Sequence, residues 1–428
     1  MSESRRDEAD IVIIGAGAAG LATAIFSGEA DVDRKLRIVL LESAKKPGAK
    51  ILISGGGRCN VTHKTVEASD YYGHKNIIRN ILRAFDVKKT RDWFHSLGVE
   101  LKEEETGKLF PTSDKARTVL DALLHRCSEL GIELLCQWRV EKIKEGPLGW
   151  RVHGADHEID TRRLIIATGG KSLPKSGSDG HGWTMLHELG LQLTDTWPAL
   201  VPLTLESDHG HENLSGISHP VRVSIQVNNK IIDFIEGELL WTHTGISGPA
   251  PMNISRTWIR QQDLGEKPQL LLSFFPGEDS NSLDRWLLDQ ATETPQRSLF
   301  HAISSRIPRR VVEFIGIQSD LDLSCQLSQL QKSVRRRLVQ QMTAFPLPVT
   351  GHRGWRLAEV TAGGIPLKEI HYQTMESKRF DGLYLTGEIL DCEGRIGGFN
   401  FQWAWATGSI AGSCCVKSLT QQESEKSS

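Results

Sequence analysis

The sequence predicts an α/β protein whose nucleotide-binding sheet is interrupted by a long insertion, and three stretches carry that prediction. Residues 10–42 read as an apolar strand, a glycine-rich turn, a helix and a second apolar strand that ends in an acidic residue. Residues 163–170 form a compact apolar strand ending in two glycines, and residues 381–402 form a strand, a glycine turn and a helix. The first stretch is a complete βαβ unit. We therefore expect a discontinuous Rossmann-type domain with an inserted domain.

The glycines of the first stretch have the spacing that a dinucleotide requires. Gly15 permits a tight turn, Gly17 lets the backbone approach a pyrophosphate, and Gly20 lets the helix pack close to the strand. The free N–H groups at the start of the helix attract an anion. Glu42 follows Gly20 by 22 residues, where a carboxylate accepts ribose hydroxyls. A purely structural glycine turn is the alternative, and it does not account for both strands and the acid.

The remaining patterns divide the chain. Helices are expected at 76–85, 87–97 and 114–130, and edge or hairpin strands within 134–144 and at 150–152. The sequence becomes β-rich near Trp197, with Asn228-Asn229 as a hairpin turn, and helical from about residue 282. The expected boundaries are a nucleotide-binding domain at 8–196, an insertion at 197–354 (β-rich 197–275, helical 276–354), a second part of the first domain at 355–417, and flexible tails at 1–7 and 418–428.

Composition narrows the class of protein. The 428 residues suggest two or three domains, and the formal net charge of −2 argues against obligate binding of DNA or another polyanion. The seven cysteines include no CxxC pair, and there is no signal peptide and no apolar run of about 20 residues. We expect a cytoplasmic protein with free thiols, no metal site and no membrane span. The oligomeric state is left open.

The segment from Pro47 to Asn60 is the second candidate ligand contact. It holds three consecutive glycines next to Ser54, Arg58, Cys59 and Asn60. Bare glycine backbone can lie flat against a ligand while neighbouring polar side chains point inward. A flexible surface loop explains the glycines but not the polar residues that follow, so we expect a ligand-binding loop. Cys59 is either reactive or a small buried residue, and nothing in the sequence indicates a lowered thiol pKa.

Five segments together resemble the BaiN/RdsA family of NAD(P)/FAD-dependent oxidoreductases, which includes YhiN-like and aminoacetone oxidase-like flavoproteins. They are GAGAAG at 15–20, KILISGGGRCN at 50–60, THTGISGP at 242–249, EVTAGGIP at 359–366 and GGFNFQWAW at 397–405. Their order agrees with the family, and the resemblance spans residues 8–415. It implies FAD as cofactor, a two-part FAD-binding domain, and an insertion made of a β-barrel-like part and a helical part.

The resemblance also implies which residues bind FAD. Those for the ADP half are Gly15, Gly17, Ala19, Gly20 and Glu42; those for the ribityl chain and ring are Lys50, Gly55, Gly57, Arg58, Cys59 and Asn60; those that close the other side are Gly387, Glu388, Gly398, Asn400 and Gln402. Further cofactor contacts, with no part of FAD assigned to them, are expected at Ala18, Ser54, Val140, Thr168, Gly169, Gly397 and Phe399. A helix N-terminus at the flavin would stabilise negative charge on the reduced ring. Asn400 by itself is more often an ordinary helix cap.

Members of the family reduce a uracil ring in ribosomal RNA, reduce conjugated double bonds in bile-acid intermediates, or oxidise a small aminoketone. The resemblance therefore implies hydride transfer at flavin N5, and we expect NAD(P)H-driven reduction of an unsaturated acceptor. Ribosomal RNA dihydrouridine synthesis, amine oxidation and a non-catalytic FAD-binding redox module are the alternatives. No second glycine fingerprint follows a strand, so NAD(P)H is expected to bind only transiently.

Three residues are the catalytic candidates: His243, Cys59 and Asn60. His243 is either a proton donor over the ring or a hydrogen-bonded histidine in a turn. Basic clusters at 45–46, 309–310 and 335–337 either contact RNA or form a solvated helix face. The partner is therefore a small-molecule substrate or ribosomal RNA.

Overall fold

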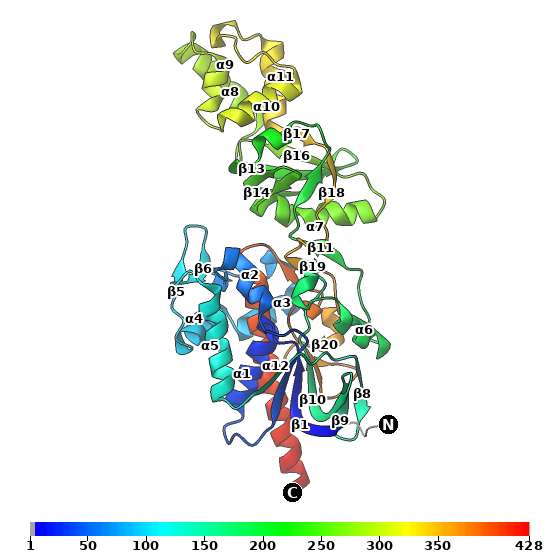
Figure 1. Cartoon of the computed structure of the whole chain (residues 1–428). Coiled ribbons are helices and arrows are strands. Elements are labelled where there is room, and N and C mark those ends of the chain that lie inside the picture. The colour runs from blue at the N-terminus through cyan, green and yellow to red at the C-terminus, as the bar shows by residue number, and fades with distance from the viewer. Residues whose placement is uncertain (1–4, 428) are drawn as a thin grey trace. The chain divides into compact units, whose positions relative to one another are not determined.

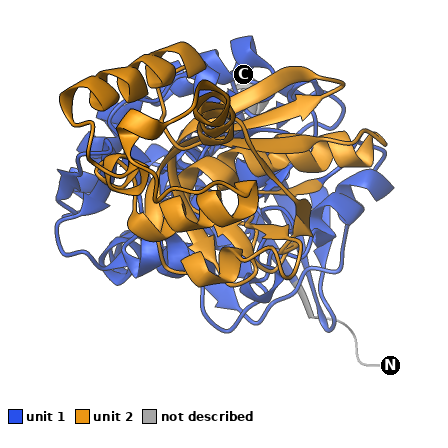
Figure 2. Cartoon of the chain, turned by 90° about the horizontal axis from the view of Figure 1, so that it is seen from above, with its two compact units in different colours: residues 1–196, 360–428 blue, residues 197–359 orange. Residues whose placement is uncertain are grey.

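A computed structural model of the chain describes the backbone of residues 5–427 and the side chains of residues 7–421 (Figure 1). The chain forms two compact units, coloured separately in Figure 2. Unit 1 takes the chain up to Thr196 and again from Val360, and unit 2 comprises Trp197–Glu359. Unit 1 is thus discontinuous, and unit 2 ends at Glu359 where the sequence suggested residue 354. Within the described residues, no helix has the length and apolar character that crossing a membrane requires.

A parallel sheet forms the centre of unit 1. Its strands run in the order β22 (Leu383–Leu385), β10 (His157–Ile166), β1 (Arg5–Ile14), β2 (Ile38–Glu42) and β7 (Glu133–Cys136), each parallel to its neighbour. Antiparallel β9 (Gly149–His153) and β8 (Lys142–Gly146) extend it from β10, and β21 (Glu376–Ser377) and β20 (Ile370–His371) extend it from β22. The adjoining segments Ile11–Ile14, Ile38–Leu41 and Leu164–Ile166 of the central strands are apolar and buried, as is typical of strands covered on both faces. This is the expected Rossmann-type α/β arrangement.

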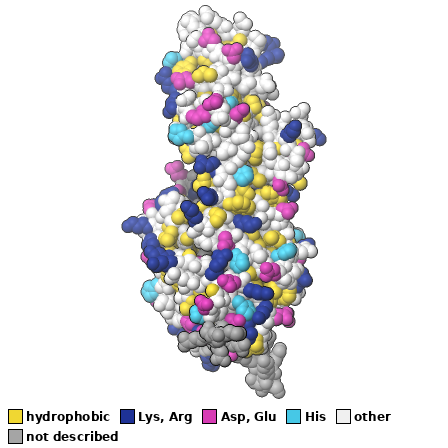
Figure 3. Space-filling model, turned by 45° about the vertical axis from the view of Figure 1, so that its right-hand side comes forward, with side chains coloured by type: hydrophobic (Ala, Val, Ile, Leu, Met, Phe, Trp, Pro, Cys, Tyr) yellow, Lys and Arg dark blue, Asp and Glu magenta, His cyan; other side chains and the backbone are white. Residues whose placement is uncertain are grey.

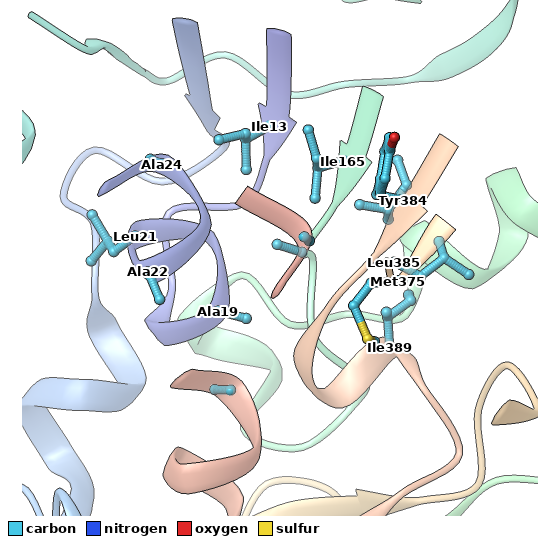
Figure 4. Close-up of a cluster of buried hydrophobic side chains, with 14 of the residues drawn as sticks. Ile13, Ala19, Leu21, Ala22, Ala24, Ile165, Met375, Tyr384, Leu385 and Ile389 are labelled. Atoms are coloured by element: carbon cyan, nitrogen blue, oxygen red, sulfur yellow. The ribbon is translucent and has the colours of Figure 1, made fainter. Parts of the chain in front are cut away.

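Two helices pack closely beside this sheet. α1 (Ala18–Ala30) and α12 (Phe399–Ser427) lie against each other, and a Cβ added at Gly408 would lie 2.8 Å from Ala22 Cβ (Figure 1). A Cβ at Gly412 would lie 2.5 Å from the Thr23 carbonyl oxygen, so small residues set this approach. Figure 4 shows the resulting core, in which Ile13, Ile165 and Leu385 of three neighbouring strands lie near the small side chains of α1.

The other elements of unit 1 surround the core. They are α2 (Ala49–Gly57), β3 (Thr62–His63), η1 (Ala68–Asp70), β4 (Tyr71–Tyr72), α3 (Lys75–Ala84), α4 (Val87–Ser96), β5 (Leu101–Glu103), β6 (Lys108–Pro111), α5 (Ala116–Glu129), η2 (Pro174–Ser176), α6 (His181–Glu188), β19 (Val360–Ala362), η5 (Leu367–Glu369), η6 (Gly387–Ile389) and β23 (Glu393–Gly394).

Two expectations for unit 1 are wrong. The segment 47–60 was expected to be a loop, but residues 49–57 form the kinked helix α2. The flexible tail expected at 418–428 is helical as far as Ser427, because α12 continues without a break, and residues 5–7 of the expected N-terminal tail belong to β1. Residues 1–4 and 428 lie outside the described residues.

Unit 2 contains a seven-stranded antiparallel sheet. Its order is β17 (Phe345–Leu347), β16 (Gln269–Ser273), β13 (Ser218–Val227), β14 (Lys230–Thr242), β15 (Gly245–Ser247), β12 (Leu203–Leu205) and β18 (Val349–His352). β17 and β18 stand at opposite ends of this order, yet only Pro348 separates them in the chain. The sheet must therefore curl until its two edges approach each other, which is a barrel-like shape. Asn228 and Asn229 form the β13–β14 turn, both with positive φ, as expected.

Helices complete unit 2. α7 (Pro249–Asp263) packs on β13 and β14, and a helical part follows with α8 (Ser280–Glu293), α9 (Leu299–Ser304), α10 (Arg309–Ser319), η4 (Leu327–Gln329) and α11 (Lys332–Thr343). β11 (Trp197–Ala199) and η3 (His211–Leu214) are its remaining elements. The segment expected to be helical, 276–354, ends in two strands, since β17 and β18 return to the sheet.

Candidate functional site

The glycine turn between β1 and α1 leaves an open cradle at a helix N-terminus. Gly15 has φ +103°, and a Cβ at Gly20 would lie 1.8 Å from the Gly15 carbonyl oxygen. Only glycine fits at these two positions. A Cβ at Gly17 would meet nothing within 4 Å, and no side chain caps the helix there. The turn therefore presents free N–H groups and open space, which is what a pyrophosphate requires.

Glu42 stands beside this cradle, at the end of β2. Its Oε2 accepts a hydrogen bond from Ala16 N (2.9 Å), and its Oε1 accepts one from Ala44 N (2.8 Å). The carboxylate thus holds the glycine turn and the loop after β2 in place. Oε1 also accepts from the Ser43 hydroxyl (3.4 Å), whereas Oε2 retains a lone pair, so the side chain is still suited to accept from a ribose hydroxyl.

α2 contains a run of left-handed backbone that only glycine adopts readily. Gly55, Gly56 and Gly57 have φ of +55°, +68° and +84°, and all three are exposed. The helical path breaks at Ser54, whose hydroxyl donates back to the Ile51 carbonyl (2.9 Å). A Cβ at Gly56 would meet nothing within 4 Å. The run is a bare, exposed backbone surface of the kind expected for contact with a flat ligand.

A polar cluster joins α2 to the second half of unit 1. Lys50 Nζ donates to Glu388 Oε2 (2.8 Å) and to Ser172 Oγ (2.7 Å). Glu388 Oε1 in turn accepts from Ser172 Oγ (2.9 Å) and from Thr361 N (2.8 Å). The side chains of Lys50 and Glu388 are 25% and 20% exposed, so the pair is largely shielded from water. This cluster fixes the carboxylate of Glu388 while leaving part of it accessible.

Buried polar atoms without a partner lie close to these residues in the chain. Asn60 Oδ1, Thr168 Oγ1 and Thr386 Oγ1 are buried and have no hydrogen-bond partner in the described part of the chain. Thr168 lies two residues after the end of β10, and Thr386 directly follows β22. A Cβ at Gly398 would lie 2.8 Å from Asn60 Oδ1, so glycine is required there. Buried polar groups are normally paired, so these atoms indicate a polar ligand. The open cradle and these unpaired atoms fit FAD.

Two side chains expected at the cofactor, those of Gln402 and Asn400, make hydrogen bonds within the protein. Gln402 is fully buried: its Oε1 accepts from Thr62 and Thr90 hydroxyls (2.7 and 2.9 Å), and its Nε2 donates to the Phe85 carbonyl (2.9 Å). Its buried oxygen is thus occupied within the protein, which does not favour contact of this side chain with FAD, and the prediction stays untested. Asn400 brackets Gly394, accepting from its N–H (2.8 Å) and donating to its carbonyl (2.9 Å). Its role as a local cap is the one that the structure supports.

The surroundings of Arg58 and Cys59 do not favour the ligand-contacting and catalytic roles expected for these residues. Arg58 pairs with Glu104 at 2.5 Å and lies over the Phe110 ring at 4.0 Å, so its charge is already balanced. Cys59 is fully buried with φ +62°, and burial raises the pKa of its thiol to about 12. A thiol with this pKa is neither a thiolate nucleophile nor an efficient acid at neutral pH. Burial and the raised pKa thus do not favour a catalytic thiol, and the catalytic role of Cys59 stays an untested prediction.

The remaining candidates lie around the same sheet edge. Gly387 has φ +73°, and a Cβ there would lie 2.6 Å from Ala19 Cβ, so these two residues are packed together. Gly169 and Gly397 have positive φ, Phe399 is buried at the start of α12, and Val140 is buried after β7. Ala18 opens α1. His243 belongs to unit 2, exposed in the turn between β14 and β15, and is thus not among the residues that unit 1 brings together.

Sequence reasoning missed Ser172, Thr361 and Thr386. Thr361 lies in the EVTAGGIP segment and Thr386 directly precedes Gly387, so both were in segments already singled out. The signal for Ser172 is weaker, since it is a serine two residues after the Gly169-Gly170 pair. In the described residues no group of three or more His, Cys, Asp or Glu side chains is arranged to hold a metal ion.

The fold and the site define an FAD-dependent oxidoreductase of the Rossmann class. The chain belongs to the family described as HI0933-like protein Rossmann domain, whose model matches residues 9–414. This match confirms the resemblance to the BaiN/RdsA family drawn from the sequence.

Two relatives match the chain over nearly its whole length. A 3-dehydro-bile acid delta(4,6)-reductase of Clostridium scindens is 31% identical, covering 94% of this chain and 98% of the relative. A ribosomal RNA dihydrouridine synthase of Escherichia coli is 32% identical, covering 93% of this chain and 96% of the relative. Among solved structures, E. coli quinol fumarate reductase FrdA has a TM-score of 0.52 at 14% identity, with 98% and 71% coverage. The last similarity concerns the fold alone.

Proposed function

We propose that this protein uses FAD reduced by NAD(P)H to reduce a carbon–carbon double bond that is conjugated to a carbonyl group. One observation carries the proposal: two relatives, each aligned over more than nine-tenths of the chain, are named for reactions of this type. A 3-oxo steroid with 4,6 unsaturation and a uracil ring both present a C=C bond next to a carbonyl. Hydride addition to such a bond places negative charge on the carbonyl oxygen.

The residues of unit 1 supply the binding and orientation that this reaction needs. Gly17 and the start of α1 would hold the pyrophosphate, and Glu42 would hold the ribose. Glu388, fixed by Lys50, would accept from the ribityl hydroxyls, and Asn60 Oδ1 would accept an N–H of the ring. When bound, FAD supplies hydride transfer at its N5 atom.

His243 remains our candidate proton donor, on the basis of its position in the THTGISGP segment. The structure supports its accessibility, since the side chain is exposed. Replacement by alanine should then slow turnover with the acceptor while leaving reduction of the flavin by NAD(P)H unchanged. Intact turnover in H243A would remove this residue from the mechanism.

The proposal is tested by two anaerobic steps. The first adds NADH or NADPH to the purified holoenzyme and follows the visible flavin absorbance, which should bleach. The second mixes the reduced enzyme with a 4-en-3-one steroid, with uridine, or with a uridine-containing RNA, and follows the return of the absorbance. Reoxidation by one of these confirms the reaction class. A spectrum that stays oxidised with both nicotinamides contradicts the proposed donor. Reduction of the flavin without reoxidation by any of these compounds contradicts the proposed acceptor. In either case, oxidation of a small amine would be the reaction to test next.

Ribosomal RNA is a specific candidate acceptor, favoured by the identity to the E. coli dihydrouridine synthase. The basic clusters give it limited support. In the cluster at residues 335–337, Arg335 pairs with Asp284 at 2.7 Å and Arg337 donates to the Ser319 carbonyl (2.5 Å). Two of the three arginines of this cluster therefore have intramolecular partners. The surface in Figure 3 likewise shows basic and acidic side chains interspersed. Affinity for ribosomal RNA should fall steeply with salt if phosphate contacts contribute, and deletion of the gene should remove one modified base.

A further inference from the structure

One arginine that the proposed function does not yet use is fixed next to the glycine turn of α12. Arg395 Nη2 lies 2.9 Å from Asp70 Oδ1, and its backbone N–H donates to the Asp70 carbonyl (3.0 Å). Asp70 is fixed in turn, because its Oδ2 accepts from Glu67 N (2.8 Å). Both the main chain and the side chain of Arg395 are therefore anchored to one residue.

An aromatic ring completes the support. The Arg395 guanidinium carbon lies 4.6 Å from the centroid of the Phe399 ring, and His63 stacks on the same ring at 5.0 Å. Phe399 is itself held, because the Tyr71 hydroxyl donates to its carbonyl (2.7 Å). Such contacts restrict the rotamers of a long side chain, so less entropy is lost when it binds a ligand.

The position of Arg395 connects it to the FAD-binding residues. Arg395 precedes the Gly397-Gly398 turn in the chain. A Cβ added at Gly398 would lie 2.8 Å from Asn60 Oδ1 and 2.7 Å from the Thr62 carbonyl oxygen, so this turn packs directly against both residues. Asp70 pairs with one terminal nitrogen of Arg395, Nη2, yet the Arg395 side chain remains 49% exposed. A guanidinium has five N–H donors, so donors remain for an external acceptor. This is an anchored, half-exposed cation beside the place where the ring is expected.

We propose that Arg395 binds the carbonyl oxygen of the acceptor and stabilises the negative charge that forms there. This inference rests on the proposed function, since it assigns the residue that recognises the conjugated carbonyl. The acceptor would take a hydride at the carbon β to its carbonyl; bound FAD, reduced beforehand by NAD(P)H, would supply this hydride and be reoxidised by two electrons. The π pair of the C=C bond moves to the carbonyl oxygen, where Arg395 donates hydrogen bonds to it, and the proton expected from His243 then adds at the α carbon. Charge-assisted hydrogen bonds from a fixed donor suit this task.

The first test uses a stable mimic of the charged oxygen. A phenolate resembles an enolate and, when stacked on oxidised flavin, produces a long-wavelength charge-transfer band. Titration of the oxidised holoenzyme with 4-chlorophenol should give this band. R395M should weaken phenolate binding by about 10- to 100-fold, R395K should recover part of the affinity, and D70N should fall between wild type and R395M because it loosens the arginine.

A matched control is available in unit 2. Arg222 pairs with Glu236 at 2.7 Å and lies 5.2 Å from the Phe234 ring, and its side chain is 38% exposed. R222M therefore removes an equally paired and stacked arginine at a place without glycine turns. It should leave phenolate binding unchanged. FAD content and the rate of reduction by dithionite, measured on every variant, show that the fold is retained.

The outcomes separate the two proposals. Equal phenolate affinity in R395M and wild type, or no binding by wild type, overturns the role of Arg395. Reoxidation of reduced R395M by a conjugated carbonyl as fast as wild type does the same. If wild-type enzyme binds phenolate through Arg395 but no conjugated carbonyl reoxidises it, the proposed function fails while the anion-binding role of Arg395 stands.

Discussion

The ion pair between Lys50 and Glu388 allows a quantitative prediction. Replacing Lys50 by methionine keeps the length of the side chain but removes the two hydrogen bonds of its Nζ, to Glu388 (2.8 Å) and Ser172 (2.7 Å). Exposed pairs contribute at most about 1 kcal/mol, whereas breaking a fully buried pair costs about 3–5 kcal/mol. At 25% and 20% exposure the pair lies between these limits, and Ser172 and Thr361 still donate to Glu388. We expect a loss of about 2 kcal/mol in the free energy of unfolding.

The assay is a denaturant titration of the FAD-free protein, with the FAD dissociation constant measured separately. Lys64 provides the control, since it pairs with Glu103 at 3.1 Å with both side chains about half exposed (51% and 42%). K64M should cost less than about 1 kcal/mol and leave FAD affinity unchanged. K50M should also bind FAD more weakly, because Glu388 loses its strongest anchor. If K50M is no less stable than K64M, the pair is not shielded as the structure indicates, and the argument fails.

Three further predictions concern single residues. Gly17→Ala should leave the stability of the FAD-free protein nearly unchanged, since its Cβ meets nothing within 4 Å, but it should weaken FAD binding. Gly20→Ala should prevent folding, because its Cβ would lie 1.8 Å from the Gly15 carbonyl oxygen. Far-ultraviolet circular dichroism should show a folded Gly17→Ala variant and an unfolded Gly20→Ala variant. Gln402→Leu should cost about 3 kcal/mol in thermal or denaturant unfolding, because the buried Thr62 hydroxyl and the Phe85 carbonyl lose their partner, while the Thr90 hydroxyl can still donate to the Asp86 carbonyl (3.1 Å). An unchanged midpoint would contradict its structural role. Burial raises the pKa of Cys59 to about 12 from 9.0, so the folded state holds the thiol proton more tightly than the unfolded state. Stability present at neutral pH should then decline between about pH 9 and pH 12, and alkylation of Cys59 by iodoacetamide at pH 8, followed by mass spectrometry, should be negligible.

Local patterns predicted the elements that have one strong periodicity. The βαβ unit at residues 10–42 follows from its apolar strands and glycine spacing, and helices α3, α4 and α5 lie within about two residues of the expected ranges. The β13–β14 turn follows from its two asparagines, which tolerate positive φ. In each case the signal comes from residues adjacent in the chain.

α2 shows where local reasoning fails. Its three glycines are poor helix formers, so the sequence predicts a loop, yet the run Ala49–Ile53 is apolar apart from Lys50 and packs one buried residue, Ile51, into the core. The glycines then take left-handed conformations that end the regular helix. Burial of one face outweighs the low propensity of the glycines.

The site shows the same division between local and long-range information. The sequence placed Glu42, Lys50, Asn60 and Glu388 among the candidates, and unit 1 contains all four. It did not reveal that Lys50 and Glu388 bind each other across 338 positions of the chain. Nor did it show that the Gln402 side chain forms hydrogen bonds with Thr62, Thr90 and Phe85, because the partners of a buried amide depend on which segments pack around it.

Short-range patterns were enough to predict the Rossmann-type class and the glycines that the backbone requires, because these depend on local conformation and fixed spacing, and the family resemblance of five segments implied FAD. Which polar side chains are free for a ligand depends instead on how the folded chain packs. Asn60 and Gln402 are both buried amides in motifs of the same family, yet Asn60 keeps an unpaired oxygen while Gln402 has none. Hydrogen-bonding capacity is shared among whatever groups the fold brings within about 3 Å, and that neighbourhood is set by packing between segments far apart in the chain.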